Sequence, residues 1–259
     1  MIKVAIITPV YNKVEYTRQL ISSLQNTDSG VEYKLVIVDN ASKDGTKDFL
    51  IPENFKGLEA PIAITNKKNK GFSIANNQGV DYVKSLGVPY YCFLNNDTIV
   101  TDGWLKEMVD CMERHAKAVI IGAKLIHPGT GRIQHAGVVE LNGHRPSHIH
   151  FGQDQSYPPA NKEKQYPAVT GACMLVKSSF YDSVGGFDEA YWCGWEDIDL
   201  CKKAIKLGYE VWYTPKARVY HYEGSTEGRM LMEDANFTFY TQRWTLRNGE
   251  SWKVAEKVL

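Results

Sequence analysis

The chain has 259 residues, of which 43% are hydrophobic and 23% charged, values that are typical of a globular domain and exclude a disordered or fibrous chain. Thirty basic and thirty acidic residues cancel, which excludes the basic surface expected of a nucleic-acid-binding protein. A chain of this length favours one large domain over two.

Cysteine usage and the N-terminus predict the cellular location. The cysteines are odd in number and form no CxxC pair, as is typical of cytosolic proteins: Cys92, Cys111, Cys173, Cys193 and Cys201. The apolar run at the N-terminus is ended by Pro9, too early for a signal peptide or a membrane span. We therefore expect a cytoplasmic protein, with at most a peripheral contact to the inner face of the membrane.

The N-terminal region follows a strand, helix, strand order. Residues 3–8 form an apolar run rich in β-branched side chains, which predicts a buried strand before Pro9. Apolar residues recur every four positions from 16 to 24 and predict a helix, and residues 33–38 predict a second buried strand. This order is typical of a parallel βαβ unit, whose ligands bind at the carboxyl ends of the strands.

Polar residues follow these strands where a nucleotide would bind. Asp39 ends the second strand, and its carboxylate can accept a hydrogen bond from a ribose hydroxyl or a base N–H; an Asx turn is the alternative. A third strand is predicted over residues 61–65 and a helix over 72–86, with Gly71 and several lysines before it. Such a helix start can hold a phosphate, although neither the dinucleotide fingerprint nor the P-loop motif occurs.

The fourth predicted strand, residues 90–94, ends in Asn95, Asn96 and Asp97. Magnesium and manganese take oxygen ligands, so a carboxylate at a strand end is well placed to bind one. We favour a metal ligand at Asp97 over a simple β-turn, because two other strands point their polar ends the same way. A helix is predicted next, over residues 104–115.

A strand over residues 118–126 precedes a long segment, residues 127–166, that is rich in Gly, Pro and His. Segments of this kind are often binding loops or lids, and we expect a mobile, partly ordered loop. His144, His148 and His150 invite a zinc interpretation, but their spacing fits no standard zinc site and no cysteine lies nearby.

Two adjacent acids stand out in the next region. Residues 168–177 predict an apolar strand, in which Gly171 would let a ligand approach the backbone. Glu196 and Asp197 then follow two tryptophans at the start of a predicted helix. A carboxylate in an aromatic pocket can have its pKa raised toward the range useful for a general base. Acids in the first turn of a helix also offset the macrodipole, which is the structural alternative.

The C-terminal part is predicted to add strands and a helix. Two short strands cover residues 210–213 and 217–220, and His221 ends the second. This histidine either completes a metal site with Asp97 or is an ordinary core histidine, and the residues leave both interpretations open. A helix predicted over residues 229–247 either covers the sheet or lies on a membrane surface.

Six motifs, taken in this order, are similar to those of one enzyme family: T-P-V-Y-N, V-D-N-A-S-x-D-G-T, N-K-G-F-S-I-A-N-N, L-N-N-D-T, V-T-G-A-C-M-L-V and G-G-F-D-E-x-Y-W-x-G-W-E-D-I-D-L-C. Over residues 4–225 the chain resembles the family 2 glycosyltransferases of the GT-A fold, close to the bacterial rhamnosyltransferase-like members. The resemblance implies an α/β fold in one domain, with a Rossmann-like, mostly parallel central sheet flanked by helices. Its nucleotide-binding half would cover about 1–115, its acceptor and catalytic half about 116–228, and a helical cover about 229–259.

The resemblance also implies an activity. Family members catalyse inverting transfer of a sugar from a UDP- or dTDP-sugar to a hydroxyl of a glycan, lipid-linked or protein-linked acceptor, with Mn²⁺ or Mg²⁺. Asp197 matches the catalytic base, and Glu196 beside it would contact the acceptor. Asp97 matches the last acid of the metal-binding DXD motif, whose first acid is replaced here by Asn95. His221 matches a histidine that binds the metal in some members.

Other matched residues would contact the substrates. The residues expected to bind the nucleotide are Thr8, Pro9, Tyr11, Asp39, Asn69, Gly71, Asn76 and Asn96. The residues expected to face the sugar or the acceptor are Trp192, Trp195 and Gly171. Asp199 is left with a role at the start of its helix.

The residues leave two alternatives to this activity. A sugar nucleotidyltransferase would share the fold class and the nucleotide, but such enzymes carry a glycine-rich loop after the first strand, where this chain has Thr8 to Asn12 without glycine. A non-catalytic module that keeps the nucleotide pocket is the second alternative, and the intact pair of Glu196 and Asp197 argues against it.

Overall fold

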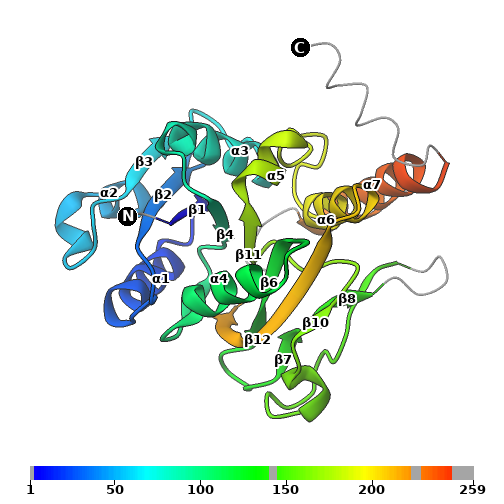
Figure 1. Cartoon of the computed structure of the whole chain (residues 1–259). Helices are drawn as coiled ribbons and strands as arrows, with labels where there is room; N and C mark the ends of the chain where they lie inside the picture. The colour runs from blue at the N-terminus through cyan, green and yellow to red at the C-terminus, as the bar shows by residue number, and fades with distance from the viewer. Residues whose placement is uncertain (1–2, 140–144, 223–228, 247–259) are drawn as a thin grey trace.

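The computed structural model describes residues 3–139, 145–222 and 229–246. Ten of their strands form one sheet in the order β10-β12-β6-β11-β4-β1-β2-β3, with β5 paired to β12 and β7 to β6, while β8 and β9 form a separate pair (Figure 1). The strands are β1 (Val4–Val10), β2 (Tyr33–Asp39), β3 (Ile62–Thr65), β4 (Tyr90–Leu94), β5 (Thr98–Val100), β6 (Ala118–Ile126), β7 (Ile133–His135), β8 (Val138–Val139), β9 (Ser147–His148), β10 (Lys164–Gln165), β11 (Cys173–Lys177) and β12 (Glu210–His221).

The helices of the described residues are α1 (Val14–Asn26), α2 (Thr46–Phe49), α3 (Phe72–Val83), α4 (Trp104–Arg114), α5 (Ser178–Ser183), α6 (Glu196–Lys206) and α7 (Arg229–Thr241). Short 3-10 turns cover Pro52–Phe55, Lys84–Leu86 and Pro158–Asn161, and a π-helical turn, Gln242–Leu246, follows α7. The predicted end of this helix, residue 247, lies outside the described residues.

The N-terminal strands β3, β2, β1 and β4 are parallel, as the strand, helix, strand order predicts. β1 pairs with β2 as far as Val10 and Asp39, and β2 pairs with β3 as far as Asp39 and Thr65, so these three strands end level. β1 continues through Pro9, past its predicted end. Its pairing with β4 stops at Ile7, which leaves Pro9 with one neighbouring strand, a position where its missing N–H is tolerated.

In the other half of the sheet, β12 ends beside Asp97, the candidate metal ligand. β11 runs antiparallel to β4 and β6, and β12 runs parallel to β6. Six strands, β1, β2, β3, β4, β6 and β12, therefore point the same way, and in this sense the sheet is mostly parallel, as predicted. The prediction of two short strands was wrong: β12 is continuous, and its register shifts around Pro215, because a strand can pass a proline at an irregularity. Its last residue, His221, pairs with Thr98 of β5, a strand the sequence did not reveal.

Helices cover both faces of the sheet. Ala5 and Ile7 of β1 belong to one hydrophobic core and Val4 and Ile6 to the other, because successive side chains of a strand point to opposite faces. This two-sided burial explains why the strands read as continuous apolar runs.

Among the described residues, no helix combines the length and the apolar content needed to cross a membrane.

The segment 127–166 was expected to be a mobile loop, and over its described residues it contains β7, β8, β9, β10 and a 3-10 turn. The buried Lys124 of β6 holds part of it, because its ammonium donates to the Gln155 carbonyl (2.6 Å) and to Asn161 Oδ1 (2.8 Å). Composition alone does not reveal such a contact, since all three residues are ordinary surface types. The described residues thus agree with the expected partial order, and the mobility of the segment stays a prediction.

The histidines of this segment have separate surroundings. His148 Nδ1 lies 2.8 Å from His135 Nδ1 of β7, and the His150 ring packs against Tyr157. His144 lies outside the described residues. A zinc site made of the three predicted histidines thus remains without support from their placement.

Helix α7 lies beside α6 (Figure 1), and the π-helical turn that follows α7 contacts α6 through a group of buried charges. Asp199 Oδ1 accepts a hydrogen bond from Trp244 Nε1 (2.7 Å) and lies 3.5 Å from Arg243 Nε, while Oδ2 lies 3.4 Å from Lys203 Nζ. Arg243 is also bonded to Asp188. Asp199 is fully buried, and two of its partners, Arg243 and Trp244, are distant in sequence. It therefore does more than serve the start of its helix, which is the role expected of it.

Replacing Asp199 with Asn keeps the size of the side chain and removes the charge that Arg243 and Lys203 face. Removing one partner of a buried ion pair costs about 3–5 kcal/mol, and we expect the free energy of unfolding in urea to fall by that order. Asp48→Asn, at an exposed first-turn position of α2, is the control and should change it by less than about 0.5 kcal/mol. Equal stability of the two variants would contradict the anchoring role.

Candidate active site

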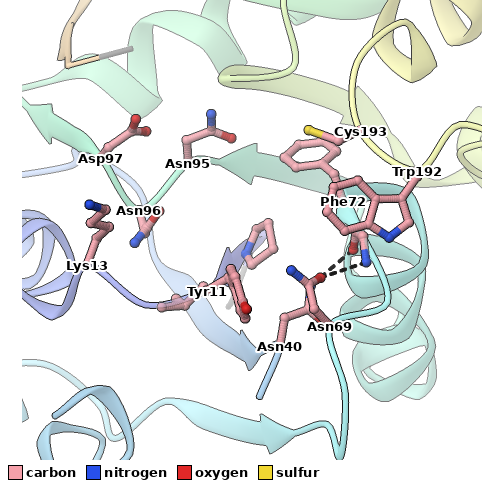
Figure 2. Close-up of a pocket in the computed structure, with 13 residues that line it drawn as sticks. Tyr11, Lys13, Asn40, Asn69, Phe72, Asn95, Asn96, Asp97, Trp192 and Cys193 are labelled. Carbon is pink, nitrogen blue, oxygen red and sulfur yellow. Dashed lines mark hydrogen bonds between the residues drawn. The ribbon is translucent and has the colours of Figure 1, made fainter. Parts of the chain in front are cut away.

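A pocket opens at the carboxyl ends of β1, β2 and β4, where the sequence predicts nucleotide binding. Its empty volume, which includes its open mouth, is about 600 Å³. Figure 2 shows Asn95, Asn96 and Asp97 on one side of it and Phe72 and Trp192 on the other. The residues that line it are Pro9, Val10, Tyr11, Lys13, Asn40, Asn69, Gly71, Phe72, Asn95, Asn96, Asp97, Trp192 and Cys193.

Hydrogen bonds fix the loop before α3 against this pocket. Asn40 Nδ2 donates to the Gly71 carbonyl (3.0 Å), and the Gly71 amide donates to Asn69 Oδ1 (2.9 Å). The next amide, that of Phe72, donates to the Trp192 carbonyl (2.6 Å). Gly71 has a φ of +85°, and a Cβ there would stand 2.4 Å from the Trp192 carbonyl oxygen. Both observations require glycine at this position.

Three residues predicted to contact the nucleotide lie behind the pocket. Asp39 is buried and accepts a hydrogen bond from the Ser42 amide (2.9 Å), in the turn after its strand. Thr8 is fully buried, and Asn76 donates to the Phe72 carbonyl within α3. The predicted nucleotide contacts that do line the pocket are Pro9, Tyr11, Asn69, Gly71 and Asn96.

Some residues that line the pocket were not predicted to contact a substrate. Asn40, Lys13, Phe72 and Cys193 belong to its lining. The signal for Asn40 was its place directly after Asp39 at a strand end. Nothing in the pattern singled out Lys13 or Cys193, because their approach to the pocket depends on the turn after β1 and on the loop before α6.

Asp97 and His221 meet at the edge of the pocket. Asp97 Oδ1 lies 3.1 Å from His221 Nε2, and His221 Nδ1 lies 2.5 Å from Gln134 Oε1 of β7. Since an amide oxygen only accepts, Nδ1 carries the proton that is donated to Gln134. In the neutral ring, the Nε2 lone pair then faces the Asp97 carboxylate.

These side chains fit a divalent cation. A lone pair and a carboxylate oxygen at 3.1 Å repel each other unless a proton or a metal ion lies between them. Asn95 Oδ1, beside them, is buried and has no hydrogen-bond partner among the described residues. Carboxylate and amide oxygens suit Mg²⁺ or Mn²⁺, an imidazole nitrogen is also accepted by Mn²⁺, and Gln134 orients the histidine as outer partners of metal ligands do.

Asp197, the predicted base, lines a second cavity with an empty volume of about 640 Å³. Its Oδ2 accepts a hydrogen bond from the Gly171 amide (2.7 Å) and its Oδ1 one from the Ile198 amide (2.8 Å). These two hydrogen bonds fix the orientation of the carboxylate. Glu196 and Gly171 line the same cavity. The residues that line both this cavity and the first pocket are Phe72, Asn95 and Cys193, so the two spaces adjoin.

The two tryptophans predicted to face a sugar lie in different places. Trp192 lines the first pocket and Trp195 the second cavity. Trp195 is only 7% exposed; its Nε1 donates to Glu233 (3.1 Å) and its ring packs on Phe237 and Tyr240 of α7. Much of the Trp195 ring is therefore used to hold the C-terminal helix.

Strand β7 supports two histidines of the site. Gln134 contacts His221, and the adjacent His135 contacts His148, which lines the second cavity. Burial lowers the pKa of His135 well below its usual value, and the nearby His148 and His221 lower it further. His135 is therefore neutral at pH 7, and its ring and that of His148 share one hydrogen bond.

Comparison with known families agrees with this geometry. Residues 5–184 match the family model "Glycosyl transferase family 2", and residues 154–225 match "N-terminal domain of galactosyltransferase". The first match spans more than half of the chain. The chain belongs to glycosyl transferase family 2. The second match includes the acids at the start of α6 and the end of β12, which the first match does not reach.

Curated relatives of this family 2 chain are mostly longer. The uncharacterized protein y4gI of Sinorhizobium fredii is 32% identical over 87% of this chain and 25% of its own length. The O-antigen biosynthesis protein RfbC of Myxococcus xanthus is 28% identical over 91% of this chain and 18% of its own length. An N-acetylglucosaminyl-diphospho-decaprenol L-rhamnosyltransferase of Mycobacterium tuberculosis is 24% identical over 75% and 68%. The chain thus spans a quarter or less of y4gI and RfbC.

A solved structure shows the fold of the family 2 chain. GalNAc-T7, crystallised with UDP, GalNAc and Mn²⁺, matches with a TM-score of 0.66 and 13% identity over 85% of this chain and 44% of that chain. The predicted α/β fold of GT-A type is confirmed.

Gly71→Ala tests whether the close contact between Gly71 and Trp192 shapes the pocket. Comparison with a second glycine of positive φ separates the effect of this contact from the cost of the backbone conformation. We expect Gly71→Ala to weaken binding of a nucleotide diphosphate such as UDP by at least tenfold, about 1.4 kcal/mol, because the added Cβ displaces Trp192. Gly57→Ala is the matched control, since Gly57 has a φ of +81° and open space around its Cβ position. Calorimetry on both variants checks this, and equal UDP affinity would show that the contact does not shape the pocket.

Proposed function

We infer that the chain is an inverting glycosyltransferase that moves a sugar from a UDP- or dTDP-sugar to a hydroxyl acceptor. The observation that carries this inference is the position of Asp197, whose carboxylate lines a cavity that adjoins the pocket at the strand ends. A sugar at the junction of the two spaces would have the nucleotide on one side and this carboxylate on the other, as inversion requires.

The donor would lie in the first pocket. Pro9, Tyr11, Asn69, Gly71 and Asn96 would surround the nucleotide, and Trp192 would face the sugar. The buried Thr8, Asp39 and Asn76 would act by shaping the strand ends and the helix start behind the lining. The ammonium of Lys13, also in the lining, would offset part of the diphosphate charge.

Asp197 would remove the proton of the acceptor hydroxyl. As the acceptor oxygen bonds to the anomeric carbon, the bond from that carbon to the diphosphate oxygen breaks, and the diphosphate leaves with the electron pair. The Gly171 amide, which donates to Asp197 Oδ2, would hold the carboxylate in place for this step. A positioned base of this kind contributes about 10²–10⁴-fold, and Glu196 beside it would contact the acceptor.

A divalent ion, Mn²⁺ or Mg²⁺, would supply charge stabilisation for the departing diphosphate when bound. Asp97 and His221 would hold it, with the Asn95 oxygen in place of the first acid of the DXD motif. Gln134 would keep His221 in the tautomer that presents Nε2.

The names of relatives support a place in polysaccharide assembly, because RfbC is named for O-antigen biosynthesis and another relative for rhamnosyl transfer. A role in surface polysaccharide or glycan synthesis is therefore proposed for this chain. The division of the chain at about residues 115 and 228 into a nucleotide-binding half, a catalytic half and a C-terminal cover stays a prediction. The cytoplasmic location and a peripheral membrane contact also stay predictions.

Asp197→Asn tests the base directly. We expect the rate of sugar transfer, or of donor hydrolysis over a panel of nucleotide sugars, to fall by about 10²–10⁴-fold, while UDP affinity measured by calorimetry stays within about twofold. Asp48→Asn, the exposed first-turn acid of α2, should keep full activity. An active Asp197→Asn enzyme would remove the base assignment and leave the acid with its helix-start role.

Gln134→Leu and Asp97→Asn test the metal site. Loss of an outer partner typically lowers metal affinity by about 10–100-fold, so Mn²⁺-dependent binding of UDP should weaken in Gln134→Leu and more strongly in Asp97→Asn. Gln165→Leu, at an exposed position of β10, is the matched control. Unchanged Mn²⁺ titrations in calorimetry for both site variants would place the metal elsewhere.

A further inference from the structure

An apolar cavity lies along α6, beyond the proposed acceptor cavity. Its empty volume is about 670 Å³. Seven of the eight side chains that line it are aliphatic or aromatic, and the eighth is a lysine: Val138, Pro146, Pro167, Ala168, Ile198, Ile205, Tyr240 and Lys202. We call this cavity the α6 groove. Neither the nucleotide nor the reacting hydroxyl occupies it in the proposed mechanism.

The α6 groove is continuous with the space around Asp197. An intervening hollow with an empty volume of about 510 Å³ shares Val138, Pro146 and Ile198 with the groove. The same hollow shares residues with the Asp197 cavity, namely His148, Thr170, Gly194, Trp195 and Asp197 itself. A molecule whose hydroxyl reaches Asp197 can therefore extend through the hollow into the groove.

Helix α6 carries both ends of this path. Asp197 is in its first turn, and Ile198, Lys202 and Ile205 follow at spacings that place them on one helix face. At 1.5 Å per residue, Ile205 lies about 12 Å along the axis from Asp197. A group at Ile205 would therefore belong to the part of the acceptor that lies beyond the sugar whose hydroxyl reaches Asp197.

The groove reaches the surface of the protein at Ile205, which lines it and is 40% exposed. Leu207 and Tyr209, which follow α6 and do not line the groove, are each 42% exposed. Lys202 and Lys206 belong to the same region of the chain. Exposed apolar residues interspersed with lysines are the combination that rests on an anionic membrane surface.

We propose that the α6 groove holds the hydrocarbon chain of a lipid-linked acceptor, so that the acceptor reaches Asp197 from the membrane surface. A peptide fits less well, because its backbone needs hydrogen-bond partners, and the side chains of the groove provide only the Lys202 ammonium and the Tyr240 hydroxyl. The proposal deepens the proposed function, on which it rests for the role of Asp197.

Binding of alkyl glucosides tests the groove without knowledge of the natural acceptor. Methyl, butyl and octyl β-glucoside, each below its micelle-forming concentration, are titrated into the full chain and followed by calorimetry. Each buried methylene strengthens binding by about fourfold, so we expect octyl glucoside to bind at least 100-fold more tightly than methyl glucoside. Equal binding of the three glucosides would overturn the proposal.

Ile205→Glu places a charge at the mouth of the groove, where the exposed side chain can change without loss of the fold. We expect it to lower the ratio of octyl glucoside affinity to methyl glucoside affinity by at least tenfold, and to leave the affinity for methyl glucoside unchanged. Leu86→Glu, at a residue that is 52% exposed after α3, is the control and should bind octyl glucoside as the native chain does. A second variant, Ile198→Ser, should weaken octyl binding from the inner end of the groove.

Two further measurements separate the remaining outcomes. Competition by acetyl-Leu-Leu-Leu-amide as strong as that by octyl glucoside would overturn the lipid assignment in favour of a peptide. Donor hydrolysis is assayed in the same samples: chain-dependent binding without any hydrolysis would refute the proposed function alone, and hydrolysis without chain-dependent binding would refute the groove alone.

Discussion

A backbone hydrogen bond from the Phe72 amide to the Trp192 carbonyl joins the two parts of the site, and beside it Ser73 Oγ donates to the Tyr191 carbonyl (2.7 Å). Phe72 begins α3 on the nucleotide side, and Trp192 lies in the loop that leads to α6 and the acids. The bond requires the backbone of Gly71 to pass where no side chain fits. The relative position of the pocket and the Asp197 cavity, which share Phe72 and Cys193, depends on this contact.

Much of the fold could be predicted from local patterns. The parallel strands are buried on both faces and therefore read as apolar runs, and polar residues follow them because the strand ends meet at one edge. Asp97 and Asp197 were singled out in this way, from a strand end and a helix start, and their roles stay proposals. The family motifs then supplied roles that no pattern of charge or hydrophobicity contains.

The errors have a common physical cause, which is that partners distant in sequence leave no local signal. Asp199 is read as a first-turn acid, yet its environment is set by Arg243 and Trp244. Gln134 is an unremarkable polar residue until β7 places it against His221. Trp195 lines the second cavity and also packs on α7, a contact that leaves no local signal because this helix comes from another part of the chain.

The pairing of β5 with β12 has a consequence for the chain as a polymer. It brings Asn95 and His221, 126 residues apart in sequence, to one place beside Asp97. An ion bound to these side chains would close a loop of that length, as a disulfide does, and the entropy of loop closure grows only slowly with length. Since the unfolded chain has no such assembled ligand set, occupancy of the site would also raise resistance to unfolding. The ion would then act as a cross-link between the nucleotide side of the sheet and its acceptor side, as well as a partner of the diphosphate.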